Sequence, residues 1–220
     1  MRVQDLKEEC RGLLKQILQH PFIRKLEDDS LPFGKFQLYM KQDYLYLLAF
    51  CQMIALLIAK LDGEEAIRRY ATILHDTITV ELDYHKNFCE RIGIQEETLR
   101  KTKPSPTTEA YSNFLLQTAY AGTTTEIVTV LYACYWSYLK IAQAMSPKHM
   151  REDYRAWIET YTSTAYQELT HSLQVDLNER LENVRENEKE HIFSLFRQSL
   201  RYEFLFWEMA FRQEAWPTDR

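Results

Sequence analysis

Glycine and proline are scarce in this sequence, with five glycines and six prolines among 220 residues. These two residue types make most tight turns possible, so a chain with few of them favours long helices over strands joined by hairpins. Apolar residues also recur at helical spacing along the whole sequence. We therefore predict an all-α fold, a single-domain helical bundle that covers residues 1–220.

The joints between the expected helices fall at proline, glycine and capping residues. We predict helices at about 3–19, from Leu31-Pro32 to about 60, at 64–92, at 106–121, from Thr123 to Ser146-Pro147, and at 148–171, 174–185 and 187–215. Ser105 is expected to cap the helix at 106–121, and Thr123 with Glu126 fits a capping box. Gly93 and Gly122 are expected to end the helices before them.

Charge and cysteine usage exclude several classes of partner. The net charge is −5, and 27 basic residues are interspersed with 32 acidic ones, so no basic stripe is available for nucleic acid. No apolar run approaches the roughly 18 residues of a membrane span, and Met1–Glu9 is too charged for a signal peptide. The widely spaced Cys10, Cys51, Cys89 and Cys134 are typical of reduced thiols. We expect a cytoplasmic protein with neither nucleic-acid nor membrane partners.

Two polar side chains stand inside aromatic helical runs near the C-terminal end of the chain. Cys134 lies within Leu131–Tyr138, and Glu203 lies within Tyr202–Trp207. Burying a carboxylate is costly unless the group is paired or used, so Glu203 needs a reason to be there. A thiol can serve as a nucleophile and a carboxylate as its acid/base partner, which makes the chain a candidate enzyme. A lone cysteine of this kind is more often a buried core thiol, and that interpretation of Cys134 stays open.

Helical spacing places further aromatic rings beside polar groups. Cys134 and Tyr138 are four residues apart and share a helix face, and Asp43 shares a face with Tyr46 on another helix. Side chains of this kind on several helices can line a small, dry pocket with stacking surfaces. A structural alternative for Asp43 is an ion pair with Lys41 or with an arginine of a neighbouring helix.

A metal centre is the competing interpretation of the carboxylates and histidines. Glu81 and His85 are four residues apart, and His191 lies beside two glutamates. Di-iron bundles usually carry a Glu-x-x-His step on two helices, whereas this step is Glu-x-x-x-His and has no second copy. His20 is a conceivable haem ligand, although a histidine before proline is more often structural. We therefore predict neither a metal nor another cofactor.

An ordered set of motifs between residues 20 and 216 carries a family resemblance. The motifs are His20-Pro21-Phe22, Leu31-Pro32 with Phe36, Gln42–Leu47, Glu81 and His85, Pro104–Thr107 with Tyr111, Cys134–Tyr138, Trp157–Tyr161, and Tyr202-Glu203 through Phe206-Trp207 to Met209-Ala210. On these stretches the chain resembles the TenA family, the thiaminase II or aminopyrimidine aminohydrolases of thiamin metabolism. The resemblance implies a haem-oxygenase-like fold without haem, assembled as a homotetramer.

The resemblance also implies a substrate and a set of site residues. The substrate is an aminopyrimidine with a leaving group on its exocyclic methylene, either 4-amino-5-aminomethyl-2-methylpyrimidine or thiamin itself. The resemblance implies that Cys134 is the nucleophile, that Glu203 is the proton donor and acceptor, and that Tyr46 provides a hydroxyl near the thiol that raises its nucleophilicity. It implies that Asp43 holds the amino group and a ring nitrogen of the substrate. The implied substrate contacts are Tyr138 and Tyr161, and the implied lining of the ring pocket is Tyr111 and Phe206. Two alternatives stay open, namely a metal-dependent oxidase on the same fold and a pyrimidine-binding protein without catalysis.

Overall fold

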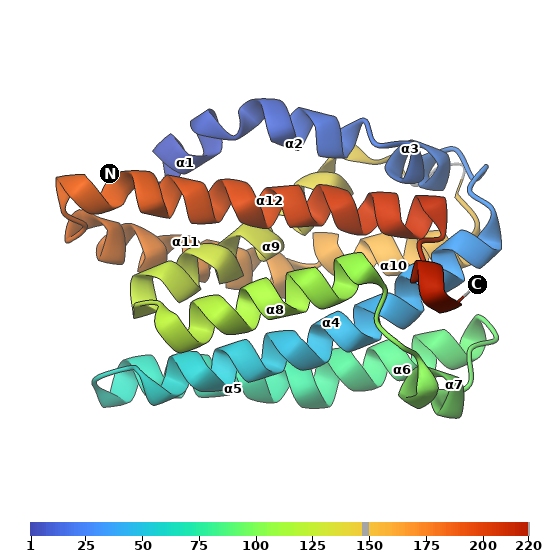
Figure 1. Ribbon diagram of the computed structural model, residues 1–220, viewed down its shortest axis with the longest axis horizontal. Coiled ribbons are helices and arrows are strands. Elements are labelled where there is room, and N and C mark those ends of the chain that lie inside the picture. Colours follow the sequence, from blue (N-terminus) through green and yellow to red (C-terminus); the bar gives the residue numbers. More distant parts are fainter. Residues whose placement is uncertain (147–149, 220) are drawn as a thin grey trace. The chain divides into compact units, whose positions relative to one another are not determined.

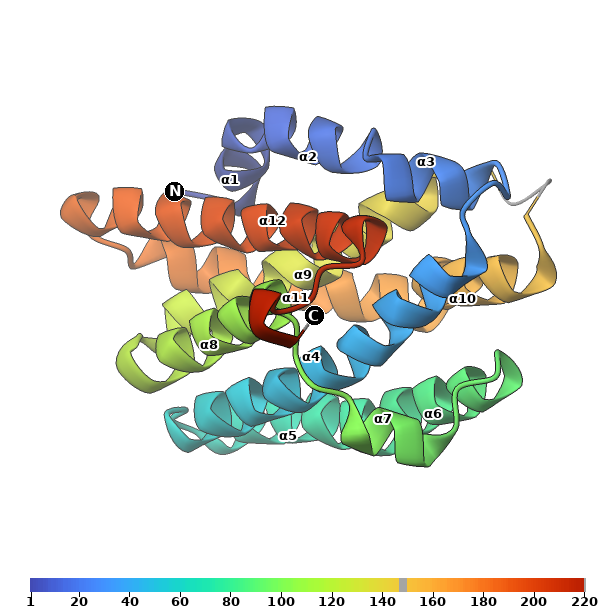
Figure 2. The same cartoon turned by 45° about the vertical axis from the view of Figure 1, so that its right-hand side comes forward.

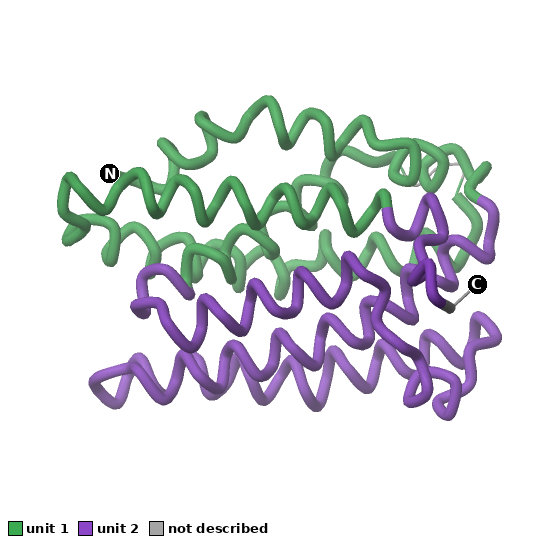
Figure 3. Tube along the Cα trace, viewed as in Figure 1, with its two compact units in different colours: residues 1–31, 128–208 green, residues 32–127, 209–220 purple. Residues whose placement is uncertain are grey.

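The computed structural model describes residues 1–146 and 150–219, and all regular structure in those residues is helical. The all-α prediction is therefore confirmed. The chain divides into two compact units, which Figure 3 distinguishes by colour: unit 1 comprises residues 1–31 and 128–208, and unit 2 comprises residues 32–127 and 209–220. That residues 1–220 form one domain stays a prediction.

Unit 1 has a core built around the buried central segment of one helix. Its helices are α1 (Val3–Glu9), α2 (Arg11–Leu18), α3 (Pro21–Glu27), α9 (Thr124–Ala144) from residue 128 on, α10 (Glu152–Thr162), α11 (Thr164–Glu182), the 3-10 turn η3 (Glu186–Glu188), and α12 (Lys189–Arg212) as far as residue 208. Along α9, each residue from Val128 to Tyr138 is at most 8% exposed. A helix that is apolar on all sides is stable only inside a core, which is where α9 lies.

Unit 2 is organised around the long helix α4. Its elements are α4 (Phe33–Ala59), α5 (Glu64–Asp76), the π-helical segment η1 (Thr77–Glu81), α6 (Leu82–Arg91), α7 (Glu96–Lys101), α8 (Pro106–Ala121) and the 3-10 turn η4 (Pro217–Asp219). Helix α4 contacts α5, α6 and α8, and it lies beside α8 in both views (Figure 1 and Figure 2).

The length and composition of α4 correct one expectation from the sequence. Among the described residues this helix is long and apolar enough to cross a membrane, because an 18-residue window within it reaches a mean hydropathy of 1.5. However, 56% of that window is buried inside the protein, and a buried core helix meets the same criterion. Its contacts with α5, α6 and α8 identify α4 as the core helix of unit 2.

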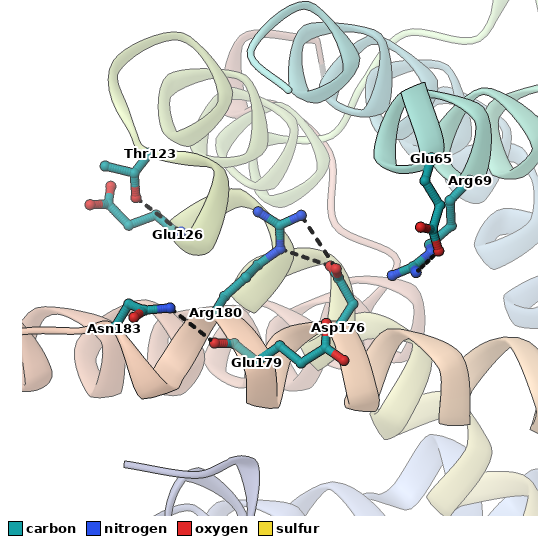
Figure 4. A network of polar contacts seen from close by, with 8 residues as sticks. All are labelled: Glu65, Arg69, Thr123, Glu126, Asp176, Glu179, Arg180 and Asn183. Atoms are coloured by element: carbon teal, nitrogen blue, oxygen red, sulfur yellow. Dashed lines mark hydrogen bonds and ion pairs between the residues drawn. The ribbon is translucent and has the colours of Figure 1, made fainter. Parts of the chain in front are cut away.

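Several predicted helix boundaries are confirmed by their local chemistry. The Ser105 hydroxyl oxygen accepts a hydrogen bond from the Thr108 amide at 3.2 Å, and the Thr123 hydroxyl accepts one from the Glu126 amide at 3.3 Å (Figure 4). Gly93 follows α6 with a φ of 84°, a left-handed conformation that glycine adopts without strain. At Gly122, a Cβ atom would lie 2.5 Å from the Thr118 carbonyl oxygen, so only glycine fits there.

The predicted N-terminal helix at 3–19 is wrong, because the segment contains two helices with a break at Cys10. No helix was predicted between residues 20 and 31, where the structure has α3. Proline is tolerated in the first turn of a helix, where its missing amide hydrogen is not needed. The Nδ1 atom of His20 accepts a hydrogen bond from the Phe22 amide at 3.1 Å and caps this helix.

The predictions for the later helices also need correction. The helix at 64–92 is interrupted by η1, and the short helix α7 was missed. The expected division between 148–171 and 174–185 is wrong, since α11 is continuous and the break occurs at Ser163. The Ser163 hydroxyl accepts a hydrogen bond from the Tyr166 amide at 3.2 Å, so it caps a new helix. The expected joint at Pro147 and the start at 148 fall outside the described residues.

Candidate active site

The candidate nucleophile of unit 1 lies on the buried helix α9. Cys134 is 8% exposed, and Tyr138, one turn further along the same face, is 6% exposed. Between them, the Ser137 hydroxyl donates a hydrogen bond to the Cys134 carbonyl oxygen at 3.0 Å. Cys134 is therefore a largely buried thiol. This burial agrees with a group that faces a substrate and also with a core thiol.

The candidate acid/base group lies on a buried stripe of α12. Phe196, Leu200, Glu203 and Trp207 follow one another at spacings of three or four residues and so share one helix face. All four are at most 1% exposed. Glu203 therefore occupies a position where the pattern of the helix calls for an apolar side chain. Such a position is unfavourable for a carboxylate unless the site uses it.

Aromatic contacts show that α9 and α12 pack against each other in the same direction. The Phe196 ring lies 6.4 Å from the Tyr132 ring and 5.6 Å from the Trp136 ring. Further along both helices, the Tyr138 and Trp207 rings are 5.5 Å apart. Because residue numbers increase together along the two helices, the helices are parallel.

Both candidate catalytic groups lie close in sequence to one of these contacts between α9 and α12. Cys134 precedes Tyr138 by one turn, and Glu203 precedes Trp207 by one turn. The Tyr138–Trp207 contact therefore lies one turn beyond Cys134 on α9 and one turn beyond Glu203 on α12.

Helix α10 adds two more rings to this cluster. The Tyr161 ring lies 4.9 Å from the Tyr138 ring, and the Trp157 ring lies 5.1 Å from that of Tyr161. Trp157 also contacts Trp207 edge-on at 6.1 Å. Phe206 is 2% exposed on the same turn of α12 as Trp207. Unit 1 thus brings the predicted Tyr138 and Tyr161 together, with the two tryptophans as members that the sequence analysis did not assign.

Unit 2 contains the other three predicted site residues. The Tyr46 hydroxyl on α4 donates a hydrogen bond to the Tyr111 hydroxyl on α8 at 3.4 Å, and the two rings are 4.8 Å apart. Asp43, one turn before Tyr46 on α4, is 6% exposed. The predicted shared face of Asp43 and Tyr46 agrees with their burial on α4.

The partner of Asp43 differs from the sequence expectation. The structure pairs Asp43 with His85 of α6, with 3.4 Å between Oδ2 and Nε2, rather than with Lys41 or an arginine. Burial raises the pKa of the nearby Glu81 carboxyl group from 4.5 to about 7, and the negative charge on Asp43 adds to this rise while His85 opposes it. Two acids and a histidine therefore share the interior of unit 2.

The residues considered as metal ligands have other surroundings. Across residues 1–146 and 150–219, no group of three or more His, Cys, Asp or Glu side chains converges as a metal site would require. Both ring nitrogens of His20 are engaged, with Nδ1 capping α3 and Nε2 lying 3.0 Å from the Glu208 carboxylate. His20 therefore has a structural role, which was the interpretation that the sequence favoured.

Comparison with known proteins identifies relatives over almost the whole sequence. The sequence model of the TENA/THI-4/PQQC family matches residues 7–213. An aminopyrimidine aminohydrolase of Halalkalibacterium halodurans is 32% identical over 214 residues, and the match covers 96% of each chain. The aminopyrimidine aminohydrolase of Bacillus subtilis is 30% identical over 216 residues, which cover 95% of this chain and 91% of that protein.

Solved structures agree with this result. A TenA homologue from P. horikoshii OT3 superposes with a TM-score of 0.90 at 28% identity, covering 96% of this chain and 99% of the other. A protein of Shewanella denitrificans OS217 with a heme oxygenase-like fold superposes with a TM-score of 0.76 at 15% identity, covering 97% and 93% of the two chains. The second match bears on the fold alone, and it confirms the expected haem-oxygenase-like fold.

Proposed function

The chain belongs to the TENA/THI-4/PQQC family, and on this premise we propose that it is an aminopyrimidine aminohydrolase. The proposed reaction replaces the amine on the exocyclic methylene of 4-amino-5-aminomethyl-2-methylpyrimidine with water. Its products are 4-amino-5-hydroxymethyl-2-methylpyrimidine and ammonia. Thiamin is the second substrate of the proposal, with the thiazole in place of the amine as leaving group.

The observation that carries the proposal is the buried pair of Cys134 and Glu203 on parallel helices. Both side chains are at most 8% exposed, and each lies one turn before the contact between Tyr138 of α9 and Trp207 of α12. A thiol beside a carboxylate is an arrangement suited to covalent catalysis with proton transfer. Two relatives named aminopyrimidine aminohydrolases, at 30–32% identity, support the substrate class.

The chemistry requires a nucleophile because an aminopyrimidine ring is electron-rich and water attacks its methylene poorly. In the proposed sequence, the Cys134 thiolate adds to a ring carbon while Glu203 protonates a ring nitrogen. The resulting enamine expels the protonated amine from the methylene. Water then adds to that methylene, and its surplus proton passes to the released ammonia. Departure of the thiolate restores the aromatic ring, and Glu203 takes back its proton from the ring nitrogen. One difficult displacement is thereby divided into easier steps.

The remaining roles are proposed from the family resemblance and from the aromatic surroundings. Tyr138, Tyr161 and Phe206 would contact the flat ring, for which aromatic faces are suitable partners. Asp43 would accept hydrogen bonds from the amino group, while Tyr46 and Tyr111 would contribute hydroxyl groups. We further propose a homotetramer, as the resemblance implies, and a location in the cytoplasm, where widely spaced cysteines stay reduced.

The test is ammonia release from the aminomethylpyrimidine by the purified chain and by Cys134→Ser. The serine hydroxyl is a far weaker nucleophile, so turnover should fall to background while the melting temperature is retained. Cys10→Ser is the matched control, since Cys10 is another buried thiol of unit 1, 2% exposed. Retention of more than about a tenth of wild-type activity by Cys134→Ser would contradict covalent catalysis. Tight binding of the pyrimidine without turnover by the wild type would instead identify a binding protein.

A further inference from the structure

The buried pair of Asp43 and His85 in unit 2 has chemistry that the proposed reaction does not yet use. Asp43 on α4 is 6% exposed and His85 on α6 is 5% exposed. The Oδ2 atom of Asp43 lies 3.4 Å from Nε2 of His85, and the other ring nitrogen, Nδ1, lies 3.6 Å from the Cys89 thiol. The histidine ring is therefore held between a carboxylate and a thiol.

The pair is incomplete as a hydrogen-bonded unit. Nε2 of His85 is fully buried and has no hydrogen bond to any described residue, because its approach to Asp43 satisfies the distance but not the geometry. Asp43 accepts no hydrogen bond from the described residues, and its oxygens, unlike Nε2 of His85, are not fully buried, so they are accessible to a ligand. Buried polar groups are nearly always bonded, and an exception calls for an explanation such as a ligand.

A structural ion pair in the same chain shows the contrast. In α11, the buried Asp176 accepts hydrogen bonds from the Arg180 side chain at 2.8 Å from Nε and 3.4 Å from the second guanidinium nitrogen (Figure 4). This pair forms within one helix, and its hydrogen bonds have good geometry. The Asp43–His85 pair joins two helices and lacks such geometry, which a purely stabilising pair would be expected to have.

The backbone beside His85 is also unusual. The segment Thr77–Glu81 is π-helical, and π-helical turns are rare and are often found at functional sites. This turn ends at Glu81, one turn before His85 on the same side of the continuous helix. The titratable groups beside Asp43 and His85 include Glu81, the Cys89 thiol and Tyr44, whose ring lies 6.3 Å from that of His85. Burial raises the pKa of the Cys89 thiol to about 12.

From this geometry we infer that His85 is a positioning residue for Asp43. Its ring lies against Oδ2 of the carboxylate and so leaves Oδ1 to accept hydrogen bonds from the bound pyrimidine. The inference rests on the proposed function, in which Asp43 binds the amino group of the substrate. His85 itself does not contact the reacting atoms, so its removal should weaken binding more than it slows the chemical step.

The experiment compares the wild type with His85→Gln, which keeps a polar side chain but removes the imidazole. KM and kcat for ammonia release are measured together with calorimetric affinity for the product, 4-amino-5-hydroxymethyl-2-methylpyrimidine. We expect a loss of affinity and a rise in KM of about tenfold, the factor that corresponds to a modest hydrogen bond to a charged group. The value of kcat and the alkylation rate of Cys134 should stay within about twofold of the wild type.

His75→Gln is the matched control, because His75 lies 3.3 Å from Asp76 in the same unit but is exposed. A double-mutant cycle with Asp43→Asn separates positioning from general packing, since a residue that acts through Asp43 should add little to the loss caused by Asp43→Asn. If His85→Gln does not fold, the cycle is repeated with His85→Asn.

The outcomes are distinguishable from those of the proposed function. A wild-type chain that neither binds the pyrimidine nor releases ammonia overturns both proposals. Turnover by the wild type, with His85→Gln equal to His75→Gln in KM and product affinity, overturns the positioning role alone. The positioning role is also overturned if His85→Gln lowers product affinity by the same factor in the wild type and in the Asp43→Asn variant.

Discussion

Replacing Glu81 by glutamine should change the way in which stability depends on pH. Burial raises the pKa of this carboxyl group from 4.5 to about 7, assisted by the charge on Asp43. Between these two values the folded chain keeps a proton that the unfolded chain has released. Stability therefore falls as pH rises through this window, and the loss is complete above the folded-state pKa.

The magnitude follows from the size of that pKa change. A rise from 4.5 to about 7 corresponds to roughly 3 kcal/mol of destabilisation at pH 8. Part of the Glu81 side chain remains exposed, so solvent screening makes this value an upper limit. Glutamine is neutral at every pH, so Glu81→Gln should match the wild type near pH 5. At pH 8 the variant should melt higher, by up to about 6–12 °C for a chain of this size.

The assay is thermal unfolding followed by circular dichroism at pH 5 and pH 8, at one protein concentration so that any assembly contributes equally. Glu90→Gln is the control, because Glu90 is an exposed carboxylate on the neighbouring helix α6. A difference in melting temperature between Glu81→Gln and the wild type that is the same at both pH values would refute the reasoning. So would a variant that is less stable at pH 8.

Three further predictions concern the proposed reaction and the assembly. Glu203→Gln should lower kcat by about a hundredfold or more, the scale of positioned acid–base catalysis; retained activity with a much lower melting temperature would make Glu203 a structural residue. Asp43→Asn should weaken discrimination between amino- and oxo-pyrimidines, which sites of this kind can make by about 10⁴-fold. It should spare alkylation of Cys134, and unchanged selectivity in kcat/KM would remove Asp43 from recognition. Sedimentation at micromolar concentration should give four times the chain mass, and a monomer would contradict the tetramer.

The parts of the fold that could be predicted are those fixed by neighbouring residues. Ser105 and Thr123 satisfy backbone amides within their own first turn, so their sequence context is sufficient to locate a helix start. The break at Ser163 depends on the same chemistry, but it lies among other hydroxyl residues that also tolerate helix interiors. Short helices such as α3 and α7 carry too few turns for their apolar spacing to be recognised.

The candidate site was predictable to a similar degree. Cys134 and Glu203 attract attention because each interrupts an aromatic helical run, and that signal is local. The partner of Asp43 was not predictable, because His85 comes from another helix and only tertiary packing brings the two together. Trp157 and Trp207 were seen as family motifs, but their contacts with the tyrosines depend on how three helices pack.

Buried carboxylates in this chain are of two kinds, which differ in whether a positively charged side chain lies three or four residues away on the same helix. Asp176 has Arg180 one turn later, so a cation on the same helix compensates its charge, and the pair forms a bonded structural unit. At the corresponding positions three and four residues away, Glu203 has only Ser199, Leu200, Phe206 and Trp207.

Asp43 follows the same pattern as Glu203. The residues three and four positions from it on α4 are Tyr39, Met40, Tyr46 and Leu47, none of which carries a positive charge. A carboxylate placed in this way depends on another helix or on a ligand for its compensation, and it is costly to keep for stability alone. This distinction is visible in the sequence before any tertiary contact is known. It selects Asp43 and Glu203 as the carboxylates whose retention a bound substrate would explain.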